Sequence, residues 1–386
     1  IRFGHEVVGC AFEDGRWRLE TADGLRDEAD FVIAATGVLH HPNLPEIEGL
    51  DRFGGAAFHS ARWRHDVPVA GRRVGVVGTG SSAIQIVSAV VGEVGELTLF
   101  QRTPQWIMPV QNPAYGEADK DEFRTRPEAI EAVRETVSRA FIDGFSILLV
   151  SRASSVPMAT HAACLCCLDQ LDAADALRDK LRPTYRAACK RLVMSPDFYD
   201  AIQQPNARLV TEPIERAERE GPRTADGRLH EPDVLVLATG FRVDRFVRPM
   251  RVRGRDGREL DRVWRDGPFA YMSVTVPGFP NFFMLNGPNA PVGNFSLIDV
   301  AERQLDYALK LVEAAGEGGP RGVAPSEHAM ERFDAERREA ARNTIWNTGC
   351  RSWYLGRDGL PTAWPWTFDR FCQEMSAPRL DDYELA

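Results

Sequence analysis

The chain has 386 residues, of which 44% are apolar, and its formal net charge at pH 7 is −9. This composition suits a globular protein of roughly two or three domains, and the negative charge argues against a nucleic-acid partner, because phosphate binding needs a basic surface. Every apolar stretch falls far short of the ~20 residues that cross a bilayer, so we expect no membrane span and a cytoplasmic location. The seven cysteines do not form the two Cys-x-x-Cys pairs of a zinc site, so we expect no metal.

The chain opens on a segment rich in predicted strands. Hydropathy alternates on either side of Asp14-Gly15, which predicts a β-hairpin over residues 6–21. Residues 31–37 predict a short buried strand that ends in Ala-Thr-Gly, and residues 233–240 repeat both the strand and the ending. The repeat resembles the two crossing points of flavoproteins with two dinucleotide-binding domains. Two unrelated buried strands are the alternative.

A spaced motif follows, Phe53-x-Gly55-x-x-x-His59-x-x-x-Trp63. At this chain's own usage of these residue types, the four fixed positions coincide by chance in under about one sequence in a thousand. The motif resembles the fingerprint of flavin-dependent Baeyer–Villiger monooxygenases, in which it precedes the NADPH-binding half. Trp63 favours this branch over the related N- and S-oxygenating enzymes, whereas Arg64 stands where the family usually has Pro or Asp.

The next segment predicts a βαβ unit, with strands at 73–77 and 96–101 around a helix at 81–91. Its turn reads Gly78-Thr-Gly80-Ser-Ser-Ala83. Gly78 allows a tight turn, Gly80 lets the backbone approach a pyrophosphate, and Ala83 permits close helix packing. The helix start at Ser81-Ser82 offers free amides to the phosphates. A glycine-rich turn without a ligand is the alternative.

The residues after the second strand of this unit distinguish NAD from NADP. An acidic residue there would bind a ribose hydroxyl and repel a phosphate, but this chain has Arg102-Thr103. A guanidinium and a hydroxyl suit the 2′-phosphate of NADPH, because Arg forms charge-assisted paired bonds to phosphate oxygens. A solvated surface charge is the alternative for Arg102.

A charged segment over residues 117–190 is predicted to be helical. The Lys190-Arg191 pair at its end resembles the family's Lys-Arg pair. The resemblance implies that Lys190 reaches the NADP phosphate and that Arg191 projects toward the flavin. A permanently charged guanidinium at that point can stabilise the negative charge that oxygen transfer to a ketone creates. A cation at a helix end is the alternative for Arg191. We group His59 with Arg191 as the candidate catalytic residues, but the resemblance links this His to domain motion and implies a hinge role.

Two C-terminal segments complete the candidate site. The run from Gly287 to Ser296 resembles the family's Gly-Pro segment near the isoalloxazine ring, which makes Asn289 a candidate cofactor contact. Trp353 resembles the tryptophan of a mobile loop that closes over the nicotinamide. A capping loop without a ligand and a core tryptophan are the respective alternatives.

We therefore predict an α/β fold with two Rossmann-like dinucleotide-binding domains, one for FAD and one for NADP, and a helical insertion. The family's N-terminal Gly-x-Gly-x-x-Gly for FAD has no counterpart in this sequence. We expect an incomplete FAD domain, short by on the order of a hundred residues, and a chain that is inactive and free of flavin by itself. The predicted division is an FAD-domain remnant at 1–38, a linker at 39–70, an NADP domain at 71–116 and 191–240, a helical insertion at 117–190, and the FAD-domain return at 241–386.

The predicted function is an FAD- and NADPH-dependent monooxygenase that turns a ketone into an ester or lactone with dioxygen. One alternative is an N- or S-oxygenating flavin monooxygenase, whose chemistry has no need for Arg191. A non-catalytic NADP-binding remnant is the other. The oligomeric state and the particular ketone are beyond the sequence.

Overall fold

A computed structural model of the chain describes residues 1–146, 155–171, 174–292, 295–316 and 322–385. Contacts within the chain group it into two units. Unit 1 comprises residues 1–40, 118–156 and 243–386, and unit 2 comprises residues 41–117 and 157–242. The predicted helical segment 117–190 is thus divided between the two units.

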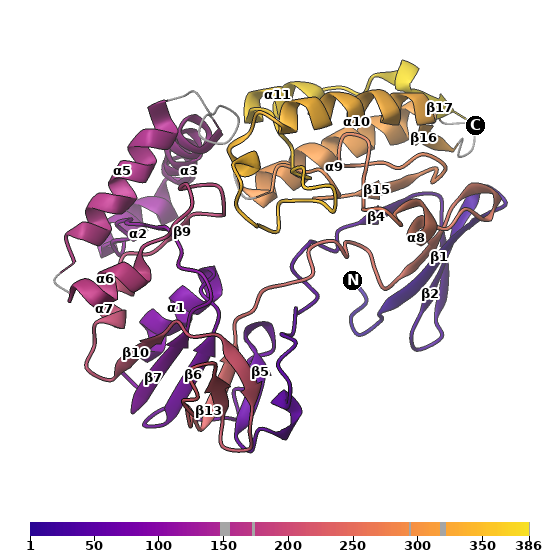
Figure 1. Ribbon diagram of the computed structural model, residues 1–386. Coiled ribbons are helices and arrows are strands. Elements are labelled where there is room, and N and C mark those ends of the chain that lie inside the picture. The colour runs from indigo at the N-terminus through magenta and orange to yellow at the C-terminus, as the bar shows by residue number, and fades with distance from the viewer. Residues whose placement is uncertain (147–154, 172–173, 293–294, 317–321, 386) are drawn as a thin grey trace. The chain divides into compact units, whose positions relative to one another are not determined.

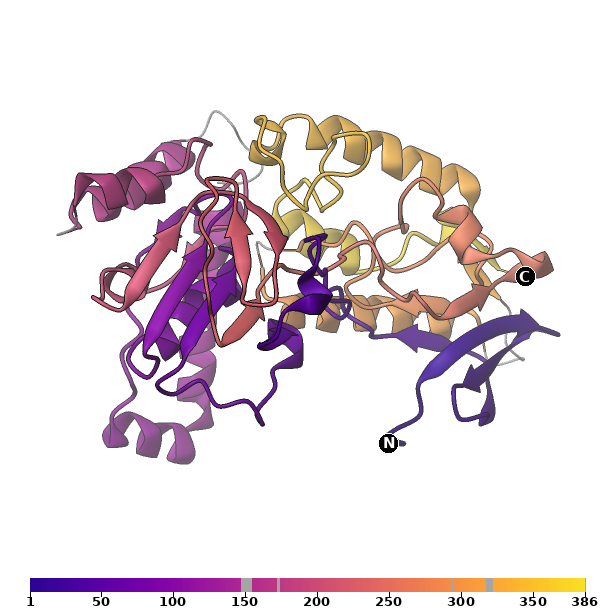
Figure 2. The same cartoon turned by 60° about the horizontal axis from the view of Figure 1, so that its bottom comes forward.

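Unit 2 is built on a parallel sheet of five strands, which lie side by side in Figure 1 and Figure 2. The strand order is β10-β7-β6-β13-β5. Parallel sheets are covered on both faces, which explains the nearly continuous apolar sequence of these strands. Their bounds are Ala56–His59 for β5, Arg73–Val77 for β6, Glu96–Phe100 for β7, Ala207–Val210 for β10 and Val234–Leu237 for β13.

The predicted βαβ unit is confirmed as β6, helix α1 (Ser81–Val90) and β7. Helix α1 buries one apolar face, with Ala83, Ile84 and Val87 at most 1% exposed. The strands face it with Val76 and Leu97, both at 0% exposure. Each fully buried aliphatic side chain contributes about 1.5–3 kcal/mol, so this face fixes the helix start beside the glycine turn.

Shorter elements surround this sheet. Strands β8 and β9 pair in parallel, and β11 pairs with β12 as an antiparallel ladder. Helix α7 packs on α1. The bounds are Ile107–Met108 for β8, Ser155–Asp169 for α5, Asp175–Leu181 for α6, Val193–Met194 for β9, Phe198–Ile202 for α7, Ile214–Ala217 for β11 and Pro222–Thr224 for β12.

Unit 1 contains a four-stranded sheet in the order β14-β1-β2-β3, and its β1–β2 pair is the predicted hairpin. Strand β4, the first Ala-Thr-Gly strand, pairs in parallel with β15, and β16 pairs antiparallel with β17. The bounds are Val7–Glu13 for β1, Arg16–Thr21 for β2, Arg26–Ala29 for β3, Val32–Ala34 for β4, Arg251–Arg253 for β14, Phe282–Met284 for β15, Val323–Pro325 for β16 and Tyr383–Leu385 for β17.

The helices of unit 1 cover β15, and Figure 1 shows α9, α10 and α11 running together beside it. Phe283 of β15 is fully buried in one cluster with Tyr307 of α9 and Phe333 of α10. Among the described helices, none combines the length and the apolar content that a membrane crossing requires. The helix bounds are Glu117–Thr125 for α2, Pro127–Phe141 for α3, Leu260–Val263 for α8, Leu297–Ala314 for α9, Glu327–Ala341 for α10 and Phe368–Met375 for α11.

Candidate dinucleotide and catalytic site

The glycine turn after β6 has the backbone that the sequence predicts. Gly78 has φ of 116°, which L side chains rarely adopt, and a Cβ there would run into the carbonyl of Ala238. Gly80 is extended and exposed, and a Cβ there would meet no atom within 4 Å. Gly78 is therefore required by the fold, whereas Gly80 leaves open space above the backbone for a ligand.

The first turn of α1 is open to an anion. Gly80 is the N-cap residue, and it has no side chain that could cap the amides that follow it. Ser81 is half-buried, Ser82 is exposed and Ala83 is fully buried against the core. The uncapped amides carry the positive end of the helix dipole, which suits a pyrophosphate.

A buried threonine that sequence reasoning missed links this turn to the end of β7. The hydroxyl of Thr79, which is 8% exposed, donates a hydrogen bond of 2.6 Å to the carbonyl oxygen of Thr103. The glycine turn and the Arg102-Thr103 corner are thereby fixed to each other. The spacing of the motif gave no signal for this bond, because it joins side chain and backbone 24 residues apart.

Arg102 and Lys190 are two cations in one neighbourhood. Arg102 is exposed, and no residue of the described chain forms an ion pair with its guanidinium. Lys190 is half-buried, and its pKa is lowered by burial and by the charge of Arg102. Two like charges that repel each other are stabilised together when an anion binds between them, and a phosphate supplies that charge.

Arg191 follows Lys190 directly and is exposed. Within the part of the chain that the structure describes, its guanidinium makes no hydrogen bond or ion pair. Ala188, two residues before Lys190, is buried with φ of 66°, a left-handed conformation that costs a non-glycine residue about 1–2 kcal/mol. This short Lys-Arg segment therefore combines backbone strain with an uncommitted cation, a combination found at functional sites.

The fingerprint motif packs one edge of the unit 2 sheet. A Cβ on Gly55 would lie 2.5 Å from the carbonyl oxygen of Asp233 and 2.5 Å from the ring of Phe53, so only glycine fits there. Trp63 packs edge-on against Phe58 of β5, with 5.1 Å between the ring centroids. Three of the four motif residues thus have packing or turn roles.

His59, the fourth motif residue, is 4% exposed and uses both ring nitrogens. Its Nδ1 accepts a bond of 3.1 Å from the amide of Ala61, so Nε2 carries the proton and donates to the carbonyl oxygen of Gly240 at 2.9 Å. The same Gly240 oxygen accepts from the amide of Asn43 at 2.8 Å. His59 therefore bonds the carbonyl of Gly240, shortly before the chain passes between the units at 242–243, and the same oxygen holds Asn43, shortly after the passage at 40–41. This geometry favours the hinge role over proton transfer.

Three histidines make the stability of unit 2 depend on pH. Burial is the largest cause that lowers the pKa of His59, His161 and His230. An unfolded histidine has a pKa of about 6.5, so each ring gains a proton on unfolding as the pH falls below that value. We expect the free energy of unfolding to keep its full value above about pH 6.5. It should decrease as the pH falls through the lowered pKa values of these histidines in the folded state. Urea unfolding between pH 7.5 and 5.5 measures this.

The substitution His161→Asn isolates one of these rings. His161 Nδ1 accepts from the amide of Ala187 at 3.4 Å, and an Asn carbonyl oxygen can accept the same bond without titrating. The variant should show a shallower loss of stability toward low pH, whereas His65→Asn, at an exposed position, should leave the slope unchanged. An identical slope in His161→Asn would contradict the assignment.

Asn289 lies in unit 1 with its amide engaged by the backbone. Its Oδ1 accepts from the amide of Ala270 at 3.2 Å, and its Nδ2 donates to the carbonyl oxygen of Thr362 at 2.8 Å. Residues 293–294 of the predicted Gly287–Ser296 run lie outside the described residues. The side chain of Asn289 therefore has a structural role in holding this loop, and cofactor contact by it stays a prediction.

Two buried polar atoms beside Gly287 lack partners in the described structure, Ser273 Oγ and Asn286 Oδ1. Both residues have left-handed backbones, with φ of 65° and 53°. A Cβ on Gly287 would collide with the carbonyl of Ser273, so these segments touch. Unpaired buried polar atoms in strained backbone are uncommon and fit a site that holds a polar ligand.

Trp353 of unit 1 is 40% exposed and stacks on Tyr354 at 4.1 Å between ring centroids. Tyr354 in turn stacks on Trp346 at 4.9 Å. Trp353 therefore lies at the surface with its ring stacked on Tyr354, and it is not a core tryptophan. Its contact with a nicotinamide stays a prediction.

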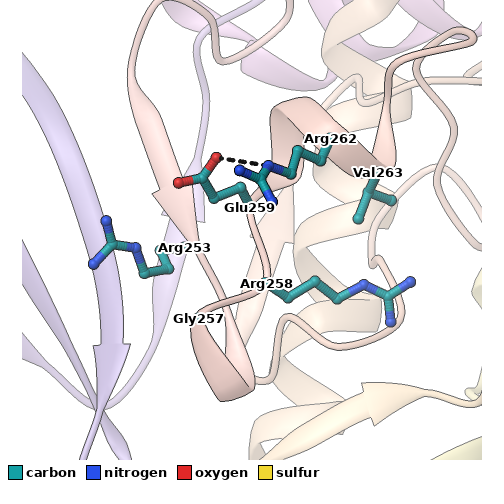
Figure 3. A pocket seen from close by; sticks show the side chains of 6 residues that line it. All are labelled: Arg253, Gly257, Arg258, Glu259, Arg262 and Val263. Atoms are coloured by element: carbon teal, nitrogen blue, oxygen red, sulfur yellow. Dashed lines mark ion pairs between the residues drawn. The ribbon is translucent and has the colours of Figure 1, made fainter.

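A surface pocket of about 690 Å³ lies between β14 and α8 of unit 1, and Figure 3 labels the residues that line it. Glu259 and Arg262, three residues apart at the start of α8, form an ion pair at 3.4 Å among the lining residues. None of the predicted site residues lines this pocket. The lining residues are Arg253, Gly257, Arg258, Glu259, Arg262 and Val263.

Comparison with known proteins gives one match to a family model and matches to relatives over the whole chain. Residues 1–130 match the family model described as pyridine nucleotide-disulphide oxidoreductase. The entire chain aligns with an uncharacterized monooxygenase of Mycobacterium tuberculosis at 44% identity, covering 77% of that protein. It also aligns with a Baeyer-Villiger monooxygenase of Streptomyces coelicolor at 38% identity, covering 75% of that protein.

A solved structure shows the same fold. The crystal structure of cyclohexanone monooxygenase from Rhodococcus sp. Phi1 bound to NADP+ matches with a TM-score of 0.84 and 27% identity. The match covers 100% of this chain and 80% of that one. The predicted architecture, a flavoprotein with two dinucleotide-binding domains, is confirmed by this likeness.

Proposed function

Because this chain belongs to the flavin-dependent Baeyer–Villiger monooxygenase family, we propose that it uses NADPH and FAD to insert one atom of dioxygen beside a ketone carbonyl. The product is an ester, or a lactone from a cyclic ketone. NADPH supplies two electrons, one oxygen atom enters the product, and the other leaves as water. The observation that carries the proposal is the pair of neighbouring cations, Arg102 and Lys190, beside an open glycine turn.

The residues of unit 2 fit NADPH. The uncapped amides of α1 would bind the pyrophosphate over Gly80. Arg102, Thr103 and Lys190 would bind the 2′-phosphate, which relieves the repulsion between the two cations. NADPH, when bound, supplies the hydride, and the role of these residues is to bind and orient it.

The Gly287 loop of unit 1 fits a polar ring system such as the flavin of FAD. Ser273 Oγ and Asn286 Oδ1 are buried without partners among the described residues and would gain them from the ligand. Gln304, at 0% exposure, holds the loop in shape, since its Oε1 accepts from the Asn286 amide at 2.6 Å. FAD, when bound, supplies the activation of dioxygen.

Arg191 would stabilise the negative charge that develops on the carbonyl oxygen of the ketone. A guanidinium keeps its charge throughout the reaction, so it can support an oxyanion without losing a proton. Its guanidinium is exposed and makes no hydrogen bond or ion pair with the described residues, so it is able to contact a substrate. Preorganised charges of this kind contribute about 10²-fold or more to rate.

Product analysis tests the proposal. The protein expressed from its own gene is incubated with FAD, NADPH and air, and with either cyclic ketones or aryl methyl sulfides. We expect NADPH consumption that depends on the ketone and yields the lactone. Sulfoxide formation with no lactone from any ketone would contradict the proposal and favour the heteroatom-oxygenating class.

A further inference from the structure

Tyr185 contacts one of the two cations in the proposed 2′-phosphate site, Lys190, and the loop that carries the other, Arg102. Its hydroxyl lies 3.0 Å from the carbonyl oxygen of Pro104 and 3.0 Å from Oε1 of Gln105. Pro104 and Gln105 follow Arg102-Thr103 directly in the chain. The Nζ of Lys190 lies over the face of the Tyr185 ring, 4.6 Å from its centroid. One side chain thus joins the loop that carries Arg102 to the ammonium of Lys190.

The backbone around Tyr185 is held from the same loop. Trp106 Nε1 donates a bond of 2.7 Å to the carbonyl oxygen of Tyr185. The Trp106 ring packs edge-on against His161 at 4.6 Å, and His161 accepts from the amide of Ala187. Residues 185–187 are therefore clamped on both sides, and the Tyr185 ring is a fixed platform.

A fixed platform matters because Lys190 is otherwise hard to hold near Arg102. A lysine side chain has four rotatable bonds, and the charge of Arg102 repels its ammonium. The ring face of Tyr185 attracts the ammonium through its quadrupole and offsets part of that repulsion before any ligand binds. Preorganisation of this kind reduces the entropy that binding must supply.

We propose that Tyr185 is a positioning residue that sets the preference for 2′-phosphorylated dinucleotides, by holding Lys190 and the loop after Arg102 in one arrangement. Tyr185 itself need not touch the ligand. The inference rests on the proposed use of NADPH. The selectivity then depends on Arg102, Tyr185 and Lys190. These residues lie in two segments of unit 2, and the Arg102-Thr103 motif supplies only the first segment.

Isothermal titration calorimetry with two small probes tests this. The probe 2′,5′-ADP carries the 2′-phosphate, and 5′-AMP lacks it. Tyr185→Phe keeps the ring under Lys190 and removes the hydroxyl, and it should weaken 2′,5′-ADP binding about two- to tenfold. Tyr185→Leu removes both and should weaken it about five- to thirtyfold. Binding of 5′-AMP should stay within about twofold of wild type in both variants, because its contacts are elsewhere.

A double-mutant cycle with Lys190→Met separates positioning from general loss of structure. If Tyr185 acts through Lys190, then Tyr185→Leu in the Lys190→Met background should cost no more than Tyr185→Phe costs in the wild type. Tyr199→Phe, at a core tyrosine of the same unit that is 8% exposed, is the control and should leave both probes unaffected. Circular dichroism confirms that each variant folds.

The outcomes separate this inference from the proposed function. Equal affinity of the wild type for the two probes would overturn the NADPH assignment and the inference with it. A wild-type preference for 2′,5′-ADP with fully additive effects of Tyr185→Leu and Lys190→Met would overturn the inference alone. If Tyr185→Leu does not fold, Tyr185→Phe is the deciding variant. An unchanged 2′,5′-ADP affinity in Tyr185→Phe would overturn the proposal that the Tyr185 hydroxyl positions the loop after Arg102.

Discussion

Arg191→Ala is expected to abolish ester formation while the reduction of the flavin by NADPH continues. The guanidinium is proposed to stabilise charge only in the oxygenation step, so hydride transfer does not depend on it. Removal of one such preorganised charge should slow oxygenation by at least about 10²-fold. The electrons from NADPH should then appear as hydrogen peroxide instead of ester. Stopped-flow absorbance of the flavin and product analysis measure the two steps separately.

Arg191→Lys is the matched variant for this prediction. Lysine keeps the positive charge but lacks the planar fork of donors, so it should restore part of the ester yield. An Arg191→Ala enzyme that forms ester at near the wild-type rate would contradict the catalytic role. The proposal for the Lys190-Arg191 segment would then reduce to NADPH binding by Lys190.

Loss of the cations at the 2′-phosphate site is expected to remove the preference for NADPH over NADH. Arg102→Ala removes a charge-assisted contact worth about 1.5–3 kcal/mol, and the exposure of Arg102 favours the lower end of that range. The affinity for NADPH should fall about tenfold or more, and the affinity for NADH should not change. The double variant Arg102→Ala, Lys190→Met should bind the two cofactors equally. Binding isotherms for both dinucleotides measure this.

Arg208→Ala is the control for nonspecific charge effects. Arg208 is an exposed arginine that pairs with Glu96 at the start of β7, at 3.3 Å, whereas Arg102 follows the end of the same strand. Its removal should leave the ratio of NADPH to NADH affinity unchanged. A wild-type protein that binds NADH as tightly as NADPH would contradict the cofactor assignment.

Local sequence determined much of this fold, because its signals lie within single elements. The periodic apolar residues of 73–100 predicted β6, α1 and β7 to within a residue at each end. Gly78 was predicted from the turn it makes, and the positive φ and the close carbonyl of Ala238 give the physical reason.

The parts of the site that depend on tertiary contacts were not predictable. Thr79 and Tyr185 act through hydrogen bonds to residues 24 and 81 positions away, and nothing in their local pattern marks them. The grouping of residues 118–156 with unit 1 likewise depends on tertiary contacts. The bonds from both His59 nitrogens to backbone groups likewise depend on tertiary contacts, and the hinge role of His59 stays a prediction.

The most direct test of the proposed reaction is mass spectrometry of the product formed under heavy-isotope-labelled dioxygen. The protein expressed from its own gene is supplied with FAD, NADPH and cyclohexanone. We expect a lactone that carries one labelled atom at the inserted ring oxygen and an unlabelled carbonyl oxygen, with one NADPH consumed for each lactone formed. Lactone without the label, or NADPH oxidation that yields only labelled hydrogen peroxide with every ketone supplied, would contradict the assignment of this chain as a ketone-oxygenating enzyme.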